Sequence, residues 1–532
     1  MHFALNFEDR IVPGEIEGVG VVLLRRSSAF VAVLLSLCVA LIYARLQTQG
    51  HDWGDDFGLY LQYASNIWNG RPINYLNSQI QVPPGFSFLF AILSPLHGWD
   101  FQYMKMVQSA FIGIFGVAAY FLARQYVSPL VALLVCAATV ANEAVFFIQQ
   151  SLIPDTPFSA IITLSLVATS RLCFLDGDGG GADRRQTYWM TPWPGLLVLA
   201  ALMMKPAGMT IALATLVGLF AALVVGRTRG ASRPVALALT ISLISIVYYY
   251  VAWNASSGDF VNNFLRYLKG YDSIVVGIAS FVWTGLQREL GDIRVLLLWF
   301  SGTAVVANLL TIVAFASAIW VLLRRRGAAP VEWFMLAHFG LMILTPWGGG
   351  PRYLLPLLPL LFLHVAYCLE TGVGAVLGRS AIAVRSPNIA LIAPSAIAVL
   401  ALVPIIWHGA NEVYGNRHTD YNEIDKPDVK DLVAWLDRNT TDQESFCSFK
   451  PRAMMYLTSR RTCYSGAWQD KSLLSEYIRK SSAKYFVVMS GQKDNPDLES
   501  TRRAAADTSL CVVFENGSFR VYGKCDQSAD AP

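Results

Sequence analysis

The segment WGDDFGLYLQYASNIWNGRPINYLNSQIQVPPG, residues 53–85, directly follows the first apolar run of the chain. Its apolar residues recur at helical spacing from Phe57 to Trp68, and polar residues occupy the opposite face. The Gly-Arg-Pro sequence that comes next ends the pattern. The segment therefore predicts a short amphipathic helix lying in a membrane interface, with the adjacent carboxylates of Asp55 and Asp56 at its N-terminal end.

The composition places most of the chain in a bilayer and excludes a soluble enzyme. Of the 532 residues, 54% are hydrophobic and 15% are charged, whereas soluble domains carry about 25% charged residues. Residues 1–16 are polar and mixed, so we expect no cleavable signal peptide before the first apolar run, which begins near Ala29. The net charge is only +4, and we expect no nucleic-acid partner.

Arginine clusters between the apolar runs predict the topology. They include residues 227–233 and 324–326, each at the end of an apolar run. By the positive-inside rule these clusters face the cytoplasm, which places the N-terminus inside and segment 53–85 outside. We expect an α-helical polytopic membrane protein with about eleven transmembrane helices, the last near residues 389–407. The predicted division is residues 1–28 as a cytoplasmic N-terminus, 29–408 as a transmembrane catalytic domain and 409–532 as an extracytoplasmic domain.

Two outer segments interrupt the alternation of spans and short loops. Residues 86–96 are apolar but too few to cross a bilayer, so we expect a juxtamembrane or re-entrant helix there. Residues 254–294 form a long outer segment after the seventh span, and we expect an interfacial helix around residues 260–268 within it.

After His408 the composition becomes that of a soluble domain. KYFVVM and LCVVF are strand-like, and VFENGSFRVY carries the Asn516-Gly517 pair typical of a hairpin turn. DVKDLVAWLDRN has a helical period, with Asp428 as the expected N-cap. These patterns predict a small C-terminal α/β domain outside the membrane.

Four of the eight cysteines lie in this domain. An even number in an oxidising compartment allows disulfides, and we favour the pairs Cys447–Cys463 and Cys511–Cys525. Free, half-buried cysteines are the alternative. The chain has no CxxC motif and no His-rich spacing, so we expect no zinc site.

Ionisable residues at the predicted outer ends of the spans are the candidates for chemistry. Asp55, Asp56 and Asp155 supply carboxylates, and Lys205 and Arg352 supply cations. Each has an ordinary structural explanation, because an aspartate can cap a helix and a long cationic side chain can anchor a span at the interface. Charged groups at membrane depth are costly and often functional, and these all fall on one predicted side of the membrane. Their joint arrangement favours a site.

Such a set suits group transfer from a lipid phosphate. A carboxylate near water can take a proton from an acceptor hydroxyl as its oxygen attacks, which is worth about 10²–10⁴-fold in rate. Lysine and arginine can neutralise the charge that develops on a departing phosphate. A phosphate bound beside lipid implies a donor whose tail lies between the spans. The residues therefore indicate glycosyl or other group transfer from a polyprenyl phosphate to an acceptor outside.

Five short motifs follow one another along the predicted spans. They are Asp55-Asp56, Pro83-Pro84-Gly85, Leu152-Ile153-Pro154-Asp155, Lys205-Pro206-Ala207-Gly208 and Arg352-Tyr353-Leu354-Leu355-Pro356. Each is weak alone, but their order resembles that of membrane glycosyltransferases of the GT-C superfamily. The resemblance covers about the first 410 residues and is to the branch of protein O-mannosyltransferases and lipid A aminoarabinose transferases.

The resemblance implies an inverting, single-displacement transfer of a hexosyl or pentosyl group from a polyprenyl- or dolichyl-phosphate donor. Asp55 would be the general base, Asp56 would support the loop or the acceptor, and Asp155 would orient the acceptor or donor. Lys205, Arg352 and Tyr353 would hold the donor phosphate. No cofactor beyond the lipid-linked donor is implied, and a divalent metal is left open.

Some relatives have a lysine just before the Pro-Pro pair, where this chain has Val82. Another cation would then replace that phosphate contact. The candidates for further contacts with donor or acceptor are Arg71, Pro83, Pro84, Arg266 and Lys269.

Two other classes of function are open at this point. A transporter or flippase of a polyprenyl-linked sugar would also need buried charges, although the sequence shows no internal repeat of the kind that many transporters have. A membrane-anchored binding or assembly protein would act through its outer domain and leave the charged set without a role. The resemblance favours the transferase, in the inner membrane with its site on the periplasmic side, and does not define the sugar or the acceptor.

Overall fold

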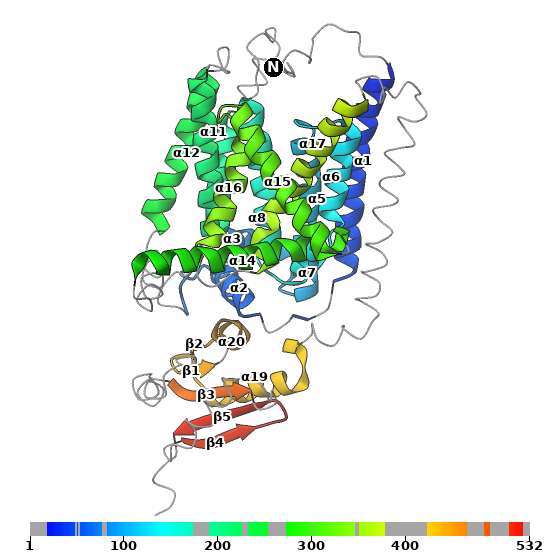
Figure 1. The fold of residues 1–532 in the computed structure, drawn as a ribbon. Coiled ribbons are helices and arrows are strands. Elements are labelled where there is room, and N and C mark those ends of the chain that lie inside the picture. The colour runs from blue at the N-terminus through cyan, green and yellow to red at the C-terminus, as the bar shows by residue number, and fades with distance from the viewer. Residues whose placement is uncertain are drawn as a thin grey trace, which may run out of the picture.

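A computed structural model shows a bundle of helices with a small sheet domain at one end (Figure 1). The structure describes the backbone of Asp55 but not its side chain. The described residues are 19–47, 50–51, 54–76, 82–173, 191–225, 232–253, 273–301, 303–345, 350–377, 423–448, 450–464, 483–489 and 510–524.

Among these residues, seven helices are long and apolar enough to cross a membrane. The pair α6 (Pro129–Val140) and α7 (Glu143–Gln150), bent by 41°, adds an eighth if it is one span. The shorter apolar helices are α10 (Pro192–Met204) and α16 (Pro330–Ile343). The seven are α1 (Val19–Arg45), α5 (Phe101–Ala123), α8 (Asp155–Cys173), η1 with α11 (Pro206–Gly208 and Met209–Val224), α12 (Ser232–Trp253), α15 (Ala304–Arg324), and η3 with α17 (Pro351–Leu357 and Leu358–Leu377).

These helices lie where the sequence predicts spans, and the last predicted span, near residues 389–407, is outside the described residues. The predicted juxtamembrane helices also form. They are α2 (Asp55–Trp68), α3 (Gly85–Ile92) and α4 (Ser94–His97). Helix α2 ends where the sequence predicts, because Gly70 follows it with a φ of +66°.

One long helix begins in the predicted outer segment, residues 254–294, and continues to Ser301. Helix α14 (Ile274–Ser301) lies across the sheet-domain end of the bundle instead of running along it (Figure 1). Four charged residues, from Arg288 to Arg294, interrupt its apolar sequence, which suits an interfacial position better than a span. The interfacial helix expected around residues 260–268 is outside the described residues.

Among the described residues, the sheet domain has five strands in the order β2-β1-β3-β5-β4. Strand β1 pairs in parallel with β2 and β3, and β5 pairs antiparallel with β3 and β4. The bounds are β1 Ser445–Ser448, β2 Arg461–Tyr464, β3 Ala483–Met489, β4 Leu510–Glu515 and β5 Phe519–Lys524, with η5 at Glu423–Asp425, α19 at Pro427–Asn439 and α20 at Pro451–Thr458.

Register explains one of the predicted disulfides. Cys447 and Cys463 are direct neighbours on the parallel strands β1 and β2, and the Cys447–Cys463 disulfide is confirmed. For the second predicted pair, Cys525 is outside the described residues, so Cys511–Cys525 stays a prediction.

The predicted N-cap of α19 is wrong by two residues. Pro427 takes the first helical position, as proline often does, so Lys426 is the N-cap and Asp428 lies in the first turn. The carboxylate of Asp428 instead accepts a hydrogen bond from Ser518 at the β4–β5 turn. It ties this helix to the hairpin.

Helix α20 of the sheet domain packs directly on α2 of the membrane domain. A Cβ atom on Gly58 would lie only 2.3 Å from the carbonyl oxygen of Arg452, so the two helices approach closely at this glycine. The Tyr456 ring packs near Phe57 and Phe101, with centroids 6.4 Å and 6.0 Å away. This contact brings the sheet domain to the N-terminal end of α2.

Replacing Gly58 by alanine is expected to lower the thermal stability of the full chain. The added methyl group would meet backbone atoms, which cannot rotate away, and overpacking of this kind costs about 1–3 kcal/mol. Gly291→Ala in α14 is the matched control, because a Cβ there meets no atom within 4 Å. Thermal unfolding of both variants checks this, and equal melting temperatures would show that α20 does not pack on α2 as described.

Candidate active site

A buried ion pair lies at the sheet-domain end of the bundle. The Nζ atom of Lys205 is 2.6 Å from Oδ1 of Asp155, and their side chains are 9% and 2% exposed. Asp155 is the first residue of α8, and Lys205 stands at the break between α10 and η1 with an extended backbone. Two charges removed from water need such pairing, since either one alone would be strongly unfavourable.

The sequence that follows Lys205 ends helix α10 at this residue, and the Lys205 side chain can then reach Asp155. Pro206 lacks the amide hydrogen that would continue α10, so the chain leaves the helix at Lys205. Gly208 then packs against the end of α10, where a Cβ atom would lie 2.7 Å from the backbone of Ala201. The Lys-Pro-Ala-Gly motif is thus a compact turn between two apolar helices.

A second carboxylate joins three elements from distant parts of the chain. Oδ2 of Asp56 is 2.8 Å from a guanidinium nitrogen of Arg352, and Oδ1 is 2.8 Å from one of Arg452. Asp56 lies on α2, Arg352 on η3, and Arg452 on α20 of the sheet domain. The three side chains are each about one-third exposed, so this cluster faces solvent more than the Lys205–Asp155 pair does.

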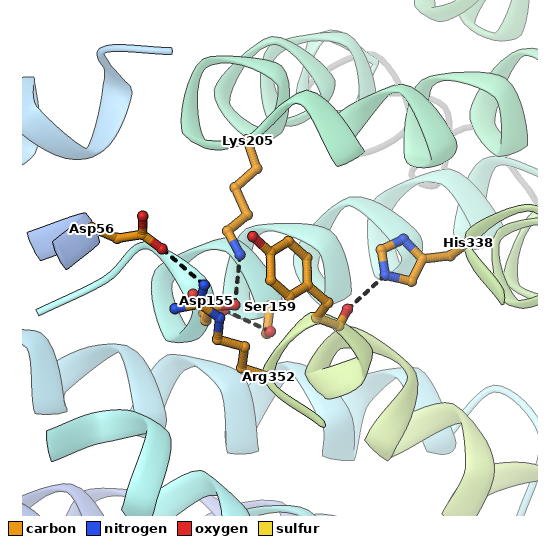
Figure 2. Close-up of polar contacts among 7 residues, drawn as sticks. Asp56, Asp155, Ser159, Lys205, His338 and Arg352 are labelled. Atoms are coloured by element: carbon orange, nitrogen blue, oxygen red, sulfur yellow. Dashed lines mark hydrogen bonds and ion pairs between the residues drawn. The ribbon is translucent and has the colours of Figure 1, made fainter. Parts of the chain in front are cut away.

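Tyr353 lies between the two groups of charges. Nζ of Lys205 is 4.2 Å from the centre of its ring, and Cζ of Arg352 is 5.1 Å from it. Cations placed over an aromatic face are attracted by the ring electrons. Figure 2 shows Asp56, Asp155, Lys205 and Arg352 pointing toward one another.

A buried histidine holds the backbone of Tyr353. Nε2 of His338 on α16 is 2.9 Å from the carbonyl oxygen of Tyr353, and Nδ1 is 3.0 Å from Oγ1 of Thr210 on α11 (Figure 2). His338 therefore links the turn that carries Lys205 to the segment that carries Arg352. The sequence analysis did not select it, although a histidine inside an apolar span is a signal of this kind.

The pKa of Asp56 differs from that of an ordinary surface carboxylate. Burial would raise the pKa of Asp56, but the guanidinium groups of Arg352 and Arg452 outweigh it and hold the pKa below 3.8. The same carboxylate acts with burial and Asp155 to raise the pKa of the Tyr60 phenol well above 10.0. Asp56 is therefore ionised at neutral pH and Tyr60 is not.

The low pKa of Asp56 predicts how its contribution to stability depends on pH. A carboxylate with a lowered folded-state pKa stabilises above its unfolded pKa, and the effect is lost as pH falls through the folded value. The melting-temperature difference between the wild type and Asp56→Asn is expected to stay constant from about pH 8 to about pH 5 and to shrink below about pH 4. A difference that instead vanished near pH 7 would contradict the two ion pairs.

The structure brings together five of the predicted site residues, and the others lie apart or are outside the described residues. The five are Asp56, Asp155, Lys205, Arg352 and Tyr353. Arg71 is exposed, with its guanidinium 5.0 Å from the ring centre of Tyr75. Pro83 and Pro84 are buried and lead into α3. The side chain of Asp55 and the residues Arg266 and Lys269 are outside the description, so their roles stay predictions.

Two arginines near this cluster were not selected from the sequence. Arg452 lies far along the chain in a soluble domain, with no motif around it. Arg288 on α14 donates hydrogen bonds to the carbonyl oxygens of Met342 and Thr345, at the end of α16. It holds the chain just before the segment that leads to Arg352. In the described part of the chain, no group of three or more His, Cys, Asp and Glu side chains is placed to hold a metal ion.

Comparison with known proteins identifies the fold. No protein-family profile matches the chain, and neither does any curated protein. Among solved structures, ArnT from Cupriavidus metallidurans bound to undecaprenyl phosphate aligns with a TM-score of 0.57 and 14% identity, over 94% of this chain and 99% of that one. The archaeal oligosaccharyltransferase AglB from Archaeoglobus fulgidus, in complex with an inhibitory peptide and a dolichol-phosphate, aligns with a TM-score of 0.55 and 14% identity, over 94% of this chain and 75% of that one.

These alignments confirm the predicted fold class, a polytopic helical bundle with a GT-C-like fold, similar to ArnT and AglB, and a small C-terminal sheet domain. The identity of 14% establishes the fold alone.

Proposed function

We propose that this protein is a glycosyltransferase that moves a sugar from a polyprenyl-phosphate donor to an acceptor on the extracytoplasmic side of the membrane. The observation that carries the proposal is the pairing of Lys205 with Asp155 and of Arg352 with Asp56 around Tyr353. It occurs at the end of a bundle that has the fold of ArnT and AglB. The structures of both neighbours contain a polyprenyl phosphate, which supports a lipid-phosphate donor here.

In this mechanism Asp55 is the general base. Its carboxylate takes the proton from an acceptor hydroxyl while that oxygen forms a bond to the anomeric carbon of the donor sugar. The bond from the anomeric carbon to the phosphate oxygen breaks, and its electron pair leaves with the polyprenyl phosphate. A single displacement of this kind inverts the anomeric configuration.

Asp56 and Asp155 are poorer bases, since both carboxylates are already held by cations. A general base works best when its pKa lies near the working pH, and the pKa of Asp56 is below its ordinary value. We therefore assign Asp56 and Asp155 to positioning. Asp56 fixes Arg352 and Arg452, and Asp155 fixes Lys205.

The cations act on the leaving group. Lys205 and Arg352 flank the ring of Tyr353, so a phosphate placed there would meet a point charge and a planar guanidinium. Both would stabilise the second negative charge that the phosphate acquires as the sugar departs. His338 holds the Tyr353 backbone and thereby the spacing of the two cations.

The proposed orientation places the N-terminus in the cytoplasm and the sheet domain outside the cytoplasmic membrane. The Cys447–Cys463 disulfide supports this, because disulfides persist in oxidising compartments such as the periplasm. The site lies at the same end of the bundle as the sheet domain, so it would also face outward (Figure 1).

A glycan comparison between a strain lacking the gene and its parent tests the function. Loss of one sugar from one envelope polymer, lipid or protein, restored by the wild-type gene, is expected, and it would name both donor and acceptor. Unchanged glycans together with a polyprenyl-linked sugar trapped on the cytoplasmic side would support a flippase instead.

A further inference from the structure

The charge balance around Tyr353 depends on a residue of the sheet domain. Within the membrane domain, the described side chains at the cluster are two carboxylates, Asp56 and Asp155, and two cations, Lys205 and Arg352. These four charges cancel. Arg452, which reaches Asp56 from α20, adds a third cation, and the carboxylate of the proposed base Asp55 adds a third anion.

A polyprenyl-phosphate sugar is a phosphodiester and carries one negative charge, so it would meet a cluster that is neutral with Arg452 and negative by one charge without it. The charge on the phosphate rises to about two as the sugar leaves, while the proposed base Asp55 becomes neutral by accepting the acceptor proton. The negative charge that the cluster has to stabilise is therefore greatest on the leaving phosphate. A third cation near the phosphate would stabilise that state.

We infer that Arg452 is a donor-binding residue, and that the sheet domain completes the phosphate site instead of only covering it. This rests on the proposed function and extends it. The guanidinium of Arg452 shares the Asp56 carboxylate with Arg352, one on each oxygen, so the two planar groups converge on one point from two domains. Such paired guanidinium groups suit the oxygens of a phosphate.

The position of Arg452 favours a role in donor binding over that of an ordinary surface ion pair. Exposed pairs contribute little on their own. Arg452, however, sits on the turn of α20 that contacts Gly58, where the two domains approach so closely that a Cβ would lie 2.3 Å from its carbonyl oxygen. The backbone that carries the guanidinium is thereby fixed relative to α2, and Asp56 orients its tip.

Binding of undecaprenyl phosphate and of uncharged undecaprenol to the purified full chain in detergent tests the inference. Arg452→Gln is expected to weaken binding of undecaprenyl phosphate by about 10- to 100-fold, the range of a charge-assisted hydrogen bond, and to leave undecaprenol binding unchanged. Arg520→Gln is the matched control. Arg520 is an arginine of the same domain, similarly exposed and paired with Glu515 on the β4–β5 hairpin.

Hydrogen exchange of α2 and α20 in the same variant separates phosphate binding from domain docking. Retained protection with weakened phosphate binding supports the inference. Protection lost in parallel with phosphate binding would make Arg452 a docking residue and overturn it, as would unchanged binding of undecaprenyl phosphate. If the wild type itself does not prefer undecaprenyl phosphate to undecaprenol, the proposed function fails as well. If the wild type and Arg452→Gln show the same preference, the inference fails alone.

Discussion

Replacement of Asp55 by asparagine is expected to reduce sugar transfer by about 10²–10⁴-fold while leaving donor binding intact. Asparagine keeps the shape of the side chain but cannot accept the proton of the attacking hydroxyl. The neighbouring Asp56 cannot take over, because Arg352 and Arg452 occupy both of its oxygens. The expected result is a protein that still binds undecaprenyl phosphate and no longer completes the transfer.

Single-turnover transfer and lipid binding, measured on the same preparation, check this prediction. Asp425→Asn is the control, because Asp425 is a carboxylate on the sheet domain that pairs with Lys430 and with none of the cations of the cluster among the described ion pairs. Transfer within a few-fold of the wild type in Asp55→Asn would show that another group is the base. Equal loss of transfer and of lipid binding would show that Asp55 serves binding instead.

Replacement of Lys205 by methionine is expected to lower the free energy of unfolding by about 3–5 kcal/mol and to abolish donor-phosphate binding. The change leaves the carboxylate of Asp155 buried without its partner. The double variant Lys205→Met/Asp155→Asn removes both charges, so it should recover most of the stability but none of the activity.

Denaturation and transfer assays on the two single variants and the double variant complete this cycle. Lys484→Met is the control, because Lys484 is a solvent-exposed lysine that pairs with Glu444, and such changes usually stay within about 0.5 kcal/mol. Additive stability losses would contradict a direct Lys205–Asp155 pair. Recovery of transfer in the double variant would contradict the assignment of Lys205 to the donor.

The sequence predicted the parts of this structure that depend on local pattern. Apolar length gave the spans, and the 3.6-residue period with its Gly-Arg-Pro stop gave α2 almost to the residue. The motif order pointed to Asp56, Asp155, Lys205, Arg352 and Tyr353, which the structure brings together. Each stands at a helix start or at a break between helices, next to an apolar run against which a polar residue is easily recognised.

What depends on tertiary packing was not predictable in the same way. Arg452 is separated from Asp56 by 396 positions and carries no pattern that distinguishes it from other surface arginines. The sequence analysis placed residues 254–294 outside the spans but did not predict that Ile274–Ser301 forms one helix across the end of the bundle. Asp428 has the residue type of an N-cap, but Pro427 takes the first helical position, so the helix starts two residues earlier than predicted and the carboxylate is free to bind the hairpin.

The adjacent aspartates Asp55 and Asp56 show most clearly what the sequence did not distinguish. Sequence alone gave them similar standing, with Asp55 preferred as base only by resemblance. The structure shows that Asp56 bridges two domains through Arg352 and Arg452, which supports its assignment as a positioning residue.

The most direct measurement is the fate of a polyprenyl-phosphate sugar added to proteoliposomes that contain the purified protein and an envelope extract as acceptor. The proposed function predicts that the wild type releases polyprenyl phosphate and transfers the sugar with inverted anomeric configuration, and that Asp55→Asn does neither. Recovery of the intact lipid-linked sugar, moved to the opposite leaflet at equal rates by the wild type and Asp55→Asn, would contradict it.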